Sequence, residues 1–241
     1  MHIPDGYLGP ITFVIMYLIM IPIWLYAGHK VQKSLKSRQV PYLALAAAFS
    51  FVIMMFNVPI PGGSTGHAVG SALVAIILGP WAAVVTTSVA LLIQCLLFGD
   101  GGVTAFGANC FNMGVVIPLI AYYAYKLISG NTLITSNLRI AAAAIAGYLG
   151  ISVAAGVAGF EMGLQPILEH TAAGVPLYMP YGLGVTVPAM LFEHMVFFSF
   201  VEAIVTALAF AYIARNSPEI IFDYETEQGK KEKAARKAAP A

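Results

Sequence analysis

The chain opens with Met1-His2-Ile3-Pro4-Asp5-Gly6, which places a histidine directly after the terminal amine. The Met1 α-amine, the His2 backbone amide and the His2 imidazole Nδ1 can close on one ion as two fused chelate rings. Such a set of three nitrogens is nearly planar, leaves one in-plane position open, and suits Ni(II) or Cu(II) better than Zn(II), Mg(II) or Ca(II). The competing interpretation is an ordinary disordered N-terminus.

The composition of the chain is that of a membrane protein. Hydrophobic residues make up 59% of it and charged residues only 10%, whereas globular chains carry about 25% charged residues. Long apolar stretches between sparse polar breaks predict an all-α integral membrane protein. No basic residue precedes the first apolar run and no clear cleavage site follows it, so we expect no signal peptide and a free amine at Met1.

Seven apolar segments predict seven transmembrane helices. They cover residues 10–28, 41–58, 67–79, 81–98, 105–128, 138–160 and 188–214. The third is shorter than the ~20 residues that an isolated span needs, so we expect neighbouring helices to surround it. Residues 1–214 then form one seven-helix domain, and residues 215–241 form a charged tail for which we predict no chemistry.

The distribution of Lys and Arg predicts the orientation of these spans. The loop at 29–38 is strongly basic, which places it in the cytoplasm and the N-terminus outside. Counting onward puts Lys126, Arg139 and the lysines of the tail on the cytoplasmic side as well. We therefore expect the N-terminus outside and the C-terminus in the cytoplasm.

With this orientation, polar and glycine-rich stretches gather on the outer side of the bundle. They contribute Asn57, Ser64 and His67 from one loop, Asp100 from the next, and Asn109 and Asn112 a short way further on. Convergent polar loops above an apolar bundle indicate an outward-facing binding site.

His67 is the candidate for the fourth nitrogen of the planar set. It ends a Pro/Gly-rich loop and enters the short third helix, where Gly66 and Gly70 allow a close approach of the backbone. A lone histidine at a membrane interface is more commonly a hydrogen-bonded structural residue, but the presence of His2 on the same face favours a metal ligand.

Ionisable residues in the last segment are further candidates, because charges at membrane depth are usually functional. Glu193 and His194 lie near its outer third, and Glu202 lies deeper. They either orient a metal-bound imidazole or make ordinary hydrogen bonds between helices. The residues expected to support the metal ligands are therefore Asn57, Ser64, Asp100, Asn109, Asn112, Glu193 and His194.

Other polar residues have weaker claims to a function. His170, Glu161 and Glu169 belong to the predicted outer loop at 161–187, where they either gather cations or are simply exposed. The sequence contains no phosphate-binding loop, no His-Glu-x-x-His motif and no nucleophile elbow. We therefore expect neither an ATPase nor another enzyme, and no catalytic residues.

Several blocks of sequence resemble the CbiM/NikM family, the substrate-binding (S) components of energy-coupling-factor (ECF) cobalt and nickel transporters. The resemblance runs from residue 1 to about residue 213. It rests on Met1 to Gly6, Pro59-x-Pro61-Gly62-Gly63-x-x-Gly66-His67, Leu78-Gly79-Pro80-Trp81, Leu97 to Gly102, Gly107-Ala108-Asn109-x-Phe111-Asn112-Met113 and Val201 to Leu208. The Pro-Asp pair after His-Ile is typical of the nickel branch, whereas cobalt members often read Met-Glu there.

The resemblance implies a seven-helix S-component that holds its metal in a square plane. The four nitrogens would be the Met1 amine, the His2 amide, the His2 imidazole and the imidazole of His67. It further implies a subunit of an ATP-driven importer of Ni(II) or Co(II) in the prokaryotic cell membrane, with the metal as cargo and no cofactor. A different interpretation is a membrane nickel sensor or scaffold that binds the ion without moving it.

The partners implied by the resemblance are a transmembrane coupling (T) protein, cytoplasmic ABC-type ATPases and a small accessory membrane subunit, and no nucleic acid. Ala44-x-x-x-Ala48 in the second segment is a small-residue face that could dock the coupling protein, although such spacing is common in membrane helices. Metal binding to these nitrogens releases protons, so the affinity is expected to fall in acid.

Overall fold

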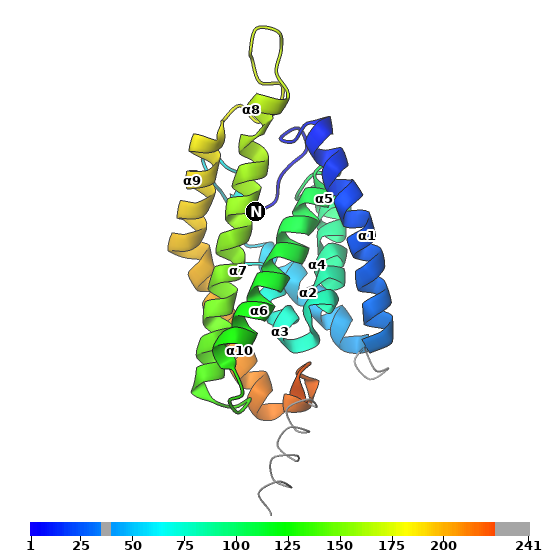
Figure 1. Ribbon diagram of the computed structural model, residues 1–241, viewed down its shortest axis with the longest axis vertical. Helices are drawn as coiled ribbons and strands as arrows, with labels where there is room; N and C mark the ends of the chain where they lie inside the picture. Colours follow the sequence, from blue (N-terminus) through cyan, green and yellow to red (C-terminus); the bar gives the residue numbers. More distant parts are fainter. Residues whose placement is uncertain (35–39, 225–241) are drawn as a thin grey trace, which may run out of the picture.

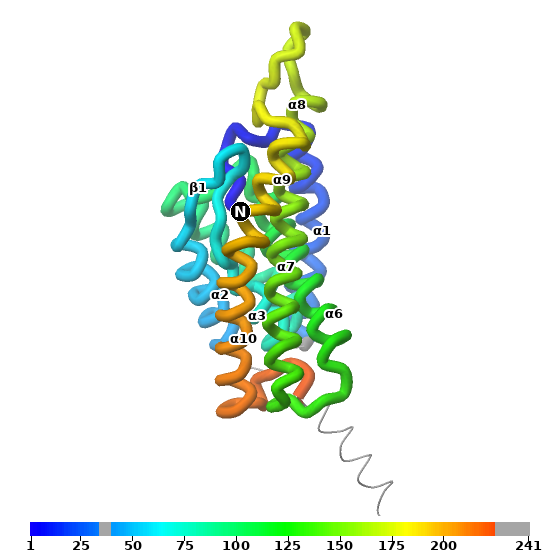
Figure 2. The backbone as a smooth tube through the Cα atoms, turned by 90° about the vertical axis from the view of Figure 1, so that its left-hand side faces the viewer, coloured from blue at the N-terminus to red at the C-terminus, as the bar shows by residue number. Residues whose placement is uncertain are grey.

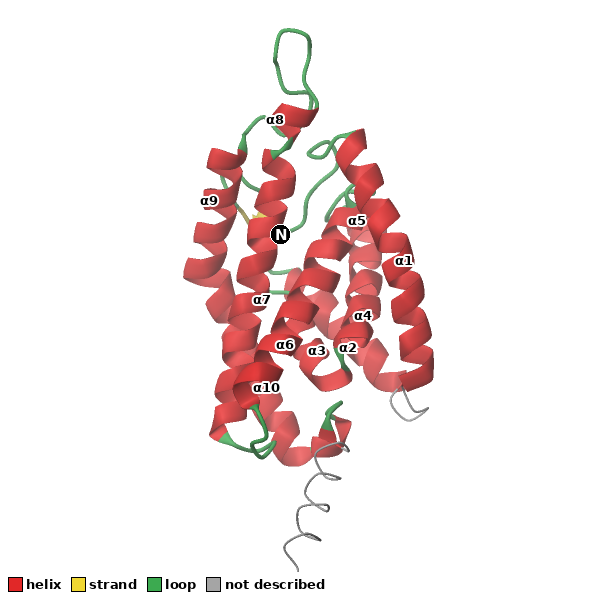
Figure 3. Ribbon diagram, viewed as in Figure 1, coloured by secondary structure: helices red, strands yellow, loops and turns green. Residues whose placement is uncertain are grey.

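The computed structural model describes residues 1–34 and 40–224, which form one elongated bundle of helices (Figure 1). The α-helices are α1 (Pro10–Ser34), α2 (Val40–Met54), α3 (Ser71–Leu78), α4 (Pro80–Ile93), α5 (Phe106–Asn109), α6 (Ile117–Ser129), α7 (Asn137–Gly163), α8 (Gln165–Leu168), α9 (Leu183–Glu193) and α10 (Ser199–Asn216). In the described ranges, the strands are limited to β1 (Val58–Pro59) and β2 (Thr65–Gly66), which pair antiparallel (Figure 3).

Three π-helical segments connect or extend these helices. The segment η2 (Gln94–Phe98) extends α4, η3 (Cys110–Val116) joins α5 to α6, and η4 (His194–Phe198) joins α9 to α10. Such bulges are rare and often occur at functional sites. A short 3₁₀ turn, η5 (Pro218–Ile220), follows α10.

Within residues 1–34 and 40–224, five helical runs are long and apolar enough to cross a membrane. They are Pro10–Lys33, Pro80–Phe98, Phe106–Ser129, Asn137–Leu168 and Leu183–Asn216, and the apolar helix Val40–Met54 is shorter. The expected helical membrane architecture is therefore confirmed, and each of the seven predicted segments contains a helix.

The short third helix lies in the middle of the bundle, as its length predicted. All eight residues of α3 are buried, so neighbouring helices cover most of its surface. Gly79 then turns the chain with a φ of +90°, a conformation that favours glycine, and Pro80 starts α4.

The long helix α7 is the scaffold along which α6, α9 and α10 lie (Figure 2). Glycines allow this close approach: a Cβ added at Gly150 would lie 3.1 Å from Ile117, and one at Gly159 would lie 2.9 Å from the Thr186 backbone oxygen. Glu161 lies in α7 and is buried, so its predicted place in an outer loop was wrong.

Several predicted helix boundaries were also wrong. The first helix continues to Ser34 rather than ending at 28, and the second ends at Met54 rather than 58. The last run begins at Leu183 rather than 188, because the Thr186 hydroxyl donates to the Gly159 carbonyl of α7 at 2.7 Å and packs this first turn of α9 on its neighbour.

The beginning of the predicted tail folds back against the bundle. The Phe222 N–H donates to the Ile77 carbonyl at 2.8 Å, and the Lys126 ammonium lies 3.0 Å from the Asp223 carboxylate. The rest of the predicted tail, residues 225–241, lies outside the described residues.

Candidate metal site

The first three residues of the chain lie inside the bundle. Met1 and Ile3 are 0% exposed and His2 is 2% exposed. Figure 1 shows the chain passing from the end of the bundle near α8 down to a terminus among the helices. The structure therefore places the terminus in the interior rather than free in solvent.

Asp5 joins the N-terminal segment to the loop at 99–105 by hydrogen bonds. The Asp5 carboxylate accepts hydrogen bonds from the Val103 N–H at 3.1 Å and from the Thr104 N–H and hydroxyl at 2.8 and 2.5 Å. Burial by itself would raise the pKa of Asp5, but these bonds outweigh it and lower the pKa. Asp5 is thus an anionic anchor for the N-terminal segment.

The loop that contains β2 lies beside Met1 and His2. The Met1 amine donates to the Thr65 carbonyl and, at 3.1 Å, to the Thr65 hydroxyl oxygen. The His2 N–H donates to the same hydroxyl oxygen at 3.2 Å, and the Ser64 hydroxyl donates to the His2 carbonyl. Two of the predicted ligand nitrogens therefore share one partner, Thr65.

The His2 ring is oriented by a residue of η2. Its Nε2 lies 3.1 Å from Gln94 Oε1, and the Gln94 amide nitrogen in turn donates to the Phe51 carbonyl at 3.3 Å. Because the Gln94 oxygen can only accept, Nε2 carries the proton and Nδ1 keeps its lone pair. That Nδ1 is buried and has no hydrogen-bond partner in the described part of the chain.

Asp100 faces this free nitrogen. Its Oδ1 lies 3.4 Å from His2 Nδ1, while its Oδ2 accepts from the Asn57 side chain at 2.9 Å. A lone pair and a carboxylate oxygen that face each other are stabilised by a cation between or beside them. Asn57 and Asp100, two of the residues expected to support the metal ligands, therefore lie beside the His2 ring.

Burial sets the protonation states at the terminus. It lowers the pKa of the Met1 amine well below 8.0, with Asp100 acting in the opposite direction. Burial lowers the pKa of His2 from 6.5 to about 3, with the Met1 charge adding to this shift and Gln94 opposing it. The Asp100 pKa is raised by burial against the effects of the Met1 amine and Asn57. Burial therefore favours the unprotonated form of both nitrogens, and that is the form that binds a metal.

His67 lies next to His2, in the loop that precedes α3 rather than within a helix as expected. The two rings stack with centroids 4.5 Å apart and an interplanar angle of 27°. His67 Nδ1 lies 3.0 Å from the Ala68 carbonyl oxygen, so it carries the proton, and its Nε2 is buried without a partner among the described residues.

The remaining predicted supporting residues are only partly at this site. Asn112 donates to the Glu161 carboxylate at 2.7 Å, away from the terminus. Glu193 is partly exposed, and none of the interactions recorded for the described ranges joins it to the site. His194 is 0% exposed, with Nδ1 2.9 Å from the Met190 carbonyl oxygen and Nε2 without a partner in the described chain.

Sequence reasoning missed Thr65, Gln94 and the anchoring role of Asp5. Gln94 had a detectable signal, since an isolated amide side chain within an apolar segment is a functional candidate. Within the described residues, no group of three or more His, Cys, Asp or Glu side chains is arranged to hold a metal. The candidate site depends instead on nitrogens of the N-terminal backbone.

The fold and site define a multi-pass membrane protein whose polar centre is built on its own N-terminal residues. Residues 2–220 match the family described as CbiM, cobalt uptake substrate-specific transmembrane region, and the chain belongs to this family. The family description is that of the substrate-specific membrane component of a metal uptake system, and the chain is a multi-pass protein of the prokaryotic cell membrane.

Named metal transport proteins from other organisms agree in sequence with most of this chain. It is 50% identical to the fused nickel transport protein NikMN of Rhodobacter capsulatus, covering 92% of this chain and 64% of that protein. It is 48% identical to the probable fused nickel transport protein LarMN of Lactiplantibacillus plantarum, covering 96% and 70%. A putative metal transport protein of Methanocaldococcus jannaschii is 47% identical, with 94% and 97% covered.

Solved structures agree in fold. A crystal structure of a transition metal transporter is 47% identical and superposes with a TM-score of 0.86, covering 94% of this chain and 99% of that one. A truncated transition metal transporter is 49% identical with a TM-score of 0.85, covering 89% and 99%.

Proposed function

We propose that this chain is the substrate-binding subunit of an ATP-driven, ECF-type importer of Ni(II), with Co(II) as the alternative cargo. It captures the ion on the outer face of the membrane in a square plane of four nitrogens. The observation that carries the proposal is the convergence of the Met1 amine, the His2 backbone and the His2 and His67 rings in one buried place.

The two imidazoles have the same pattern of hydrogen bonds. Each ring has one nitrogen tied to a carbonyl-type oxygen, of Gln94 or of Ala68, and the other buried with a free lone pair. We therefore assign His2 Nδ1 and His67 Nε2 as ligands. Two imidazoles bound side by side to one ion at metal–nitrogen distances of about 2.0 Å have ring centres roughly 4–5 Å apart, and the observed 4.5 Å agrees with that arrangement.

The fourth ligand in this proposal is the His2 amide nitrogen after loss of its proton. An amidate in the plane gives a strong ligand field that favours four-coordinate Ni(II), whereas Zn(II) prefers a tetrahedron. The Asp100 carboxylate beside His2 adds a negative charge that stabilises a bound cation. Nickel is also the metal in the names of the Rhodobacter capsulatus and Lactiplantibacillus plantarum relatives.

The first test is nickel binding by purified protein with its native N-terminus, beside a variant that carries one additional N-terminal residue. We expect one equivalent of Ni(II) with the yellow, diamagnetic signature of a square plane, and loss of both in the extended variant. Equal binding by the two proteins would show that the Met1 amine is not a ligand, and the proposed site would then be wrong.

Transport would require other chains, because the sequence has no nucleotide-binding loop of its own. We infer seven spans with the N-terminus outside and the C-terminus in the cytoplasm, a transmembrane coupling protein, a pair of ABC-type ATPases and an accessory membrane subunit. Residues 1–214 would be the membrane domain and residues 215–241 a cytoplasmic extension.

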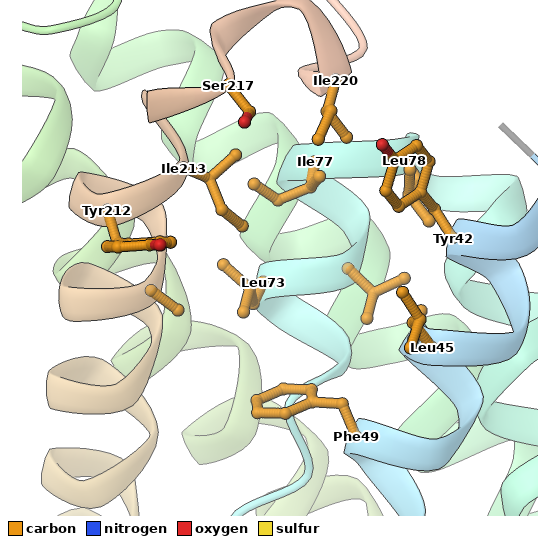
Figure 4. Close-up of a pocket in the computed structure, with 13 residues that line it drawn as sticks. Tyr42, Leu45, Phe49, Leu73, Ile77, Leu78, Tyr212, Ile213, Ser217 and Ile220 are labelled. Carbon is orange, nitrogen blue, oxygen red and sulfur yellow. The ribbon is translucent and has the colours of Figure 1, made fainter. Parts of the chain in front are cut away.

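An open apolar groove supports a docking face for the coupling protein. It has a volume of about 360 Å³ and lies between α2, α3 and α10 (Figure 4). Tyr42 and Leu45 of α2 face Tyr212 and Ile213 of α10 across it, with residues of α3 at its floor. Ala44 and Ala48 are exposed on α2, where small side chains allow a partner helix to approach closely.

A membrane sensor or scaffold that binds nickel without moving it is the second candidate, since the same site would serve it. Uptake of labelled nickel by cells that express the chain with and without its ATPase partners separates the two. ATPase-dependent uptake supports the importer, and binding without uptake in either case supports the sensor.

A further inference from the structure

Glu202 is a buried carboxylate in α10 that the proposed metal site does not use as a ligand. It is 0% exposed. One of its oxygens accepts from the Val69 N–H at 2.8 Å, and both oxygens accept from the Gly70 N–H at 3.0 Å. Glu202 therefore binds the backbone segment that leads from His67 into α3. These bonds join positions more than a hundred residues apart in the chain.

One peptide group connects Glu202 to the His67 ring. The carbonyl of Ala68 accepts from His67 Nδ1 at 3.0 Å, and the N–H of the same peptide, contributed by Val69, donates to Glu202. The order of groups is imidazole N–H, peptide carbonyl, peptide N–H and carboxylate. An anion at the N–H end polarises the peptide and makes its carbonyl a better acceptor.

The turn at Gly70 leaves the first N–H groups of α3 in need of hydrogen-bond partners. Gly70 has a φ of +76° and precedes α3 without a side-chain cap, and an added Cβ would lie 2.4 Å from the ring of Phe49. Because α3 is wholly buried, water cannot satisfy its first N–H groups. A carboxylate at the positive end of a helix fits both the hydrogen bonds and the dipole.

The packing of α9, η4 and α10 keeps the rest of this loop in place. A Cβ added at Gly63 would lie 2.8 Å from the Met190 sulfur, and one at Gly66 would lie 2.1 Å from the Phe198 ring. Successive parts of the loop at 63–70 thus contact Met190, Phe198 and Glu202. Of these three side chains, Glu202 makes hydrogen bonds to the loop.

We propose that Glu202 is the positioning residue for His67: through the Ala68–Val69 peptide it fixes the ring with Nδ1 protonated and Nε2 free to bind the metal. This rests on the proposed function in one respect, the role of His67 as a metal ligand. Hydrogen-bond partners behind a metal-binding imidazole typically change metal affinity by about 10- to 100-fold.

The test is a double-mutant cycle on nickel affinity, with Glu202→Gln and His67→Ala alone and together. The glutamine keeps the shape of the side chain but turns an N–H₂ group toward two backbone N–H groups. We expect Glu202→Gln to weaken Ni(II) binding roughly 10- to 100-fold and to shift its visible spectrum to that of His67→Ala. In the His67→Ala background the same change should have no further effect, because the ligand through which it acts is gone.

The matched control is Glu193→Gln, a glutamate of the same helical run that is partly exposed and has no recorded contact with the loop at 63–70 in the described chain. It should leave both affinity and spectrum unchanged. A readout that needs no metal is backbone hydrogen exchange in peptides covering residues 67–78, which should accelerate in Glu202→Gln and not in Glu193→Gln.

Two results would overturn the proposal: wild-type nickel binding in folded Glu202→Gln, or an equal loss of affinity with and without His67. If Glu202→Gln does not fold, Glu202→Asp, which keeps the charge and shortens the reach, is used in the same cycle with the same two outcomes. A wild-type protein that binds no nickel would instead contradict the proposed function.

Discussion

The side chain of Asn109 pairs with the backbone of Ile3 in the manner of a neighbouring strand. Its Oδ1 accepts from the Ile3 N–H at 2.8 Å, and its Nδ2 donates to the Ile3 carbonyl at 3.0 Å. The Gly102 N–H reaches the same carbonyl at 3.0 Å. A buried amide thus fixes the residue that follows His2, and with it the plane in which the His2 nitrogens lie.

We expect Asn109→Ala to weaken nickel binding by roughly 10- to 100-fold, because two buried hydrogen bonds of about 0.5–1.5 kcal/mol each are lost. Isothermal titration of the purified protein measures this change. Asn131→Ala, in an exposed loop, is the control and should bind like wild type. An unchanged affinity in Asn109→Ala would mean that Ile3 is held well enough by Gly102 alone.

Gln94→Leu tests the protonation pattern of His2. Leucine fills a similar volume but cannot accept from Nε2, so the ring is free to move its proton to Nδ1, the proposed ligand atom. We expect about a tenfold loss of nickel affinity with little change in thermal stability. Gln32→Leu, at an exposed position of α1, is the control. Loss of stability without loss of affinity would assign Gln94 to packing alone.

The stability of the metal-free protein should fall in acid because of His2. Its pKa is about 3 in the folded protein and 6.5 in the unfolded chain. Because the folded value is the lower one, the unfolded chain binds the proton more readily. The contribution of neutral His2 to the free energy of unfolding is complete above pH 6.5. It is lost as the pH falls toward 3, by up to about 1.4 kcal/mol per pH unit.

This pH dependence is measured as the thermal midpoint between pH 7 and pH 5 in wild type and in His2→Gln. A thiol-reactive dye reports unfolding, since Cys95 and Cys110 are both free and buried. The midpoint of wild type should fall more steeply than that of His2→Gln, and the exposed-site control His29→Gln should follow wild type. Parallel curves for wild type and His2→Gln would contradict the buried, neutral state of His2.

Ala48→Phe tests the small-residue face of α2, formed by Ala44 and Ala48, as a docking face. Ala48 is exposed on α2, so a phenylalanine is tolerated by the isolated chain but prevents a partner helix from approaching closely. We expect nickel binding to stay at the wild-type level while ATPase-dependent uptake falls about tenfold, equivalent to 1.4 kcal/mol. Ala141→Phe, exposed on α7, should not affect uptake. Normal uptake in Ala48→Phe would remove this face from the proposal.

The positions of the helices were largely predictable, because apolar composition and the breaks at glycine, proline and charge are local properties. The sequence correctly predicted that the third segment contains a helix packed among its neighbours, since the apolar stretch at 67–79 is too short to span a bilayer alone. It misplaced the start of α9, because Pro188 resembles a helix start and the Thr186 bond that extends the helix comes from α7.

The proposed ligands of the terminus could be chosen from the sequence, because covalent geometry alone places the amine, the amide and the ring of a histidine in second position close enough to bind one ion. Only the tertiary structure decided the hydrogen-bond partners and the burial of those residues. Thr65, Gln94 and Glu202 act on partners 63 to 133 positions away, and no local pattern specifies such pairings. The protonation pattern of each ring follows from them, because a buried imidazole has only the partners that the folded chain supplies.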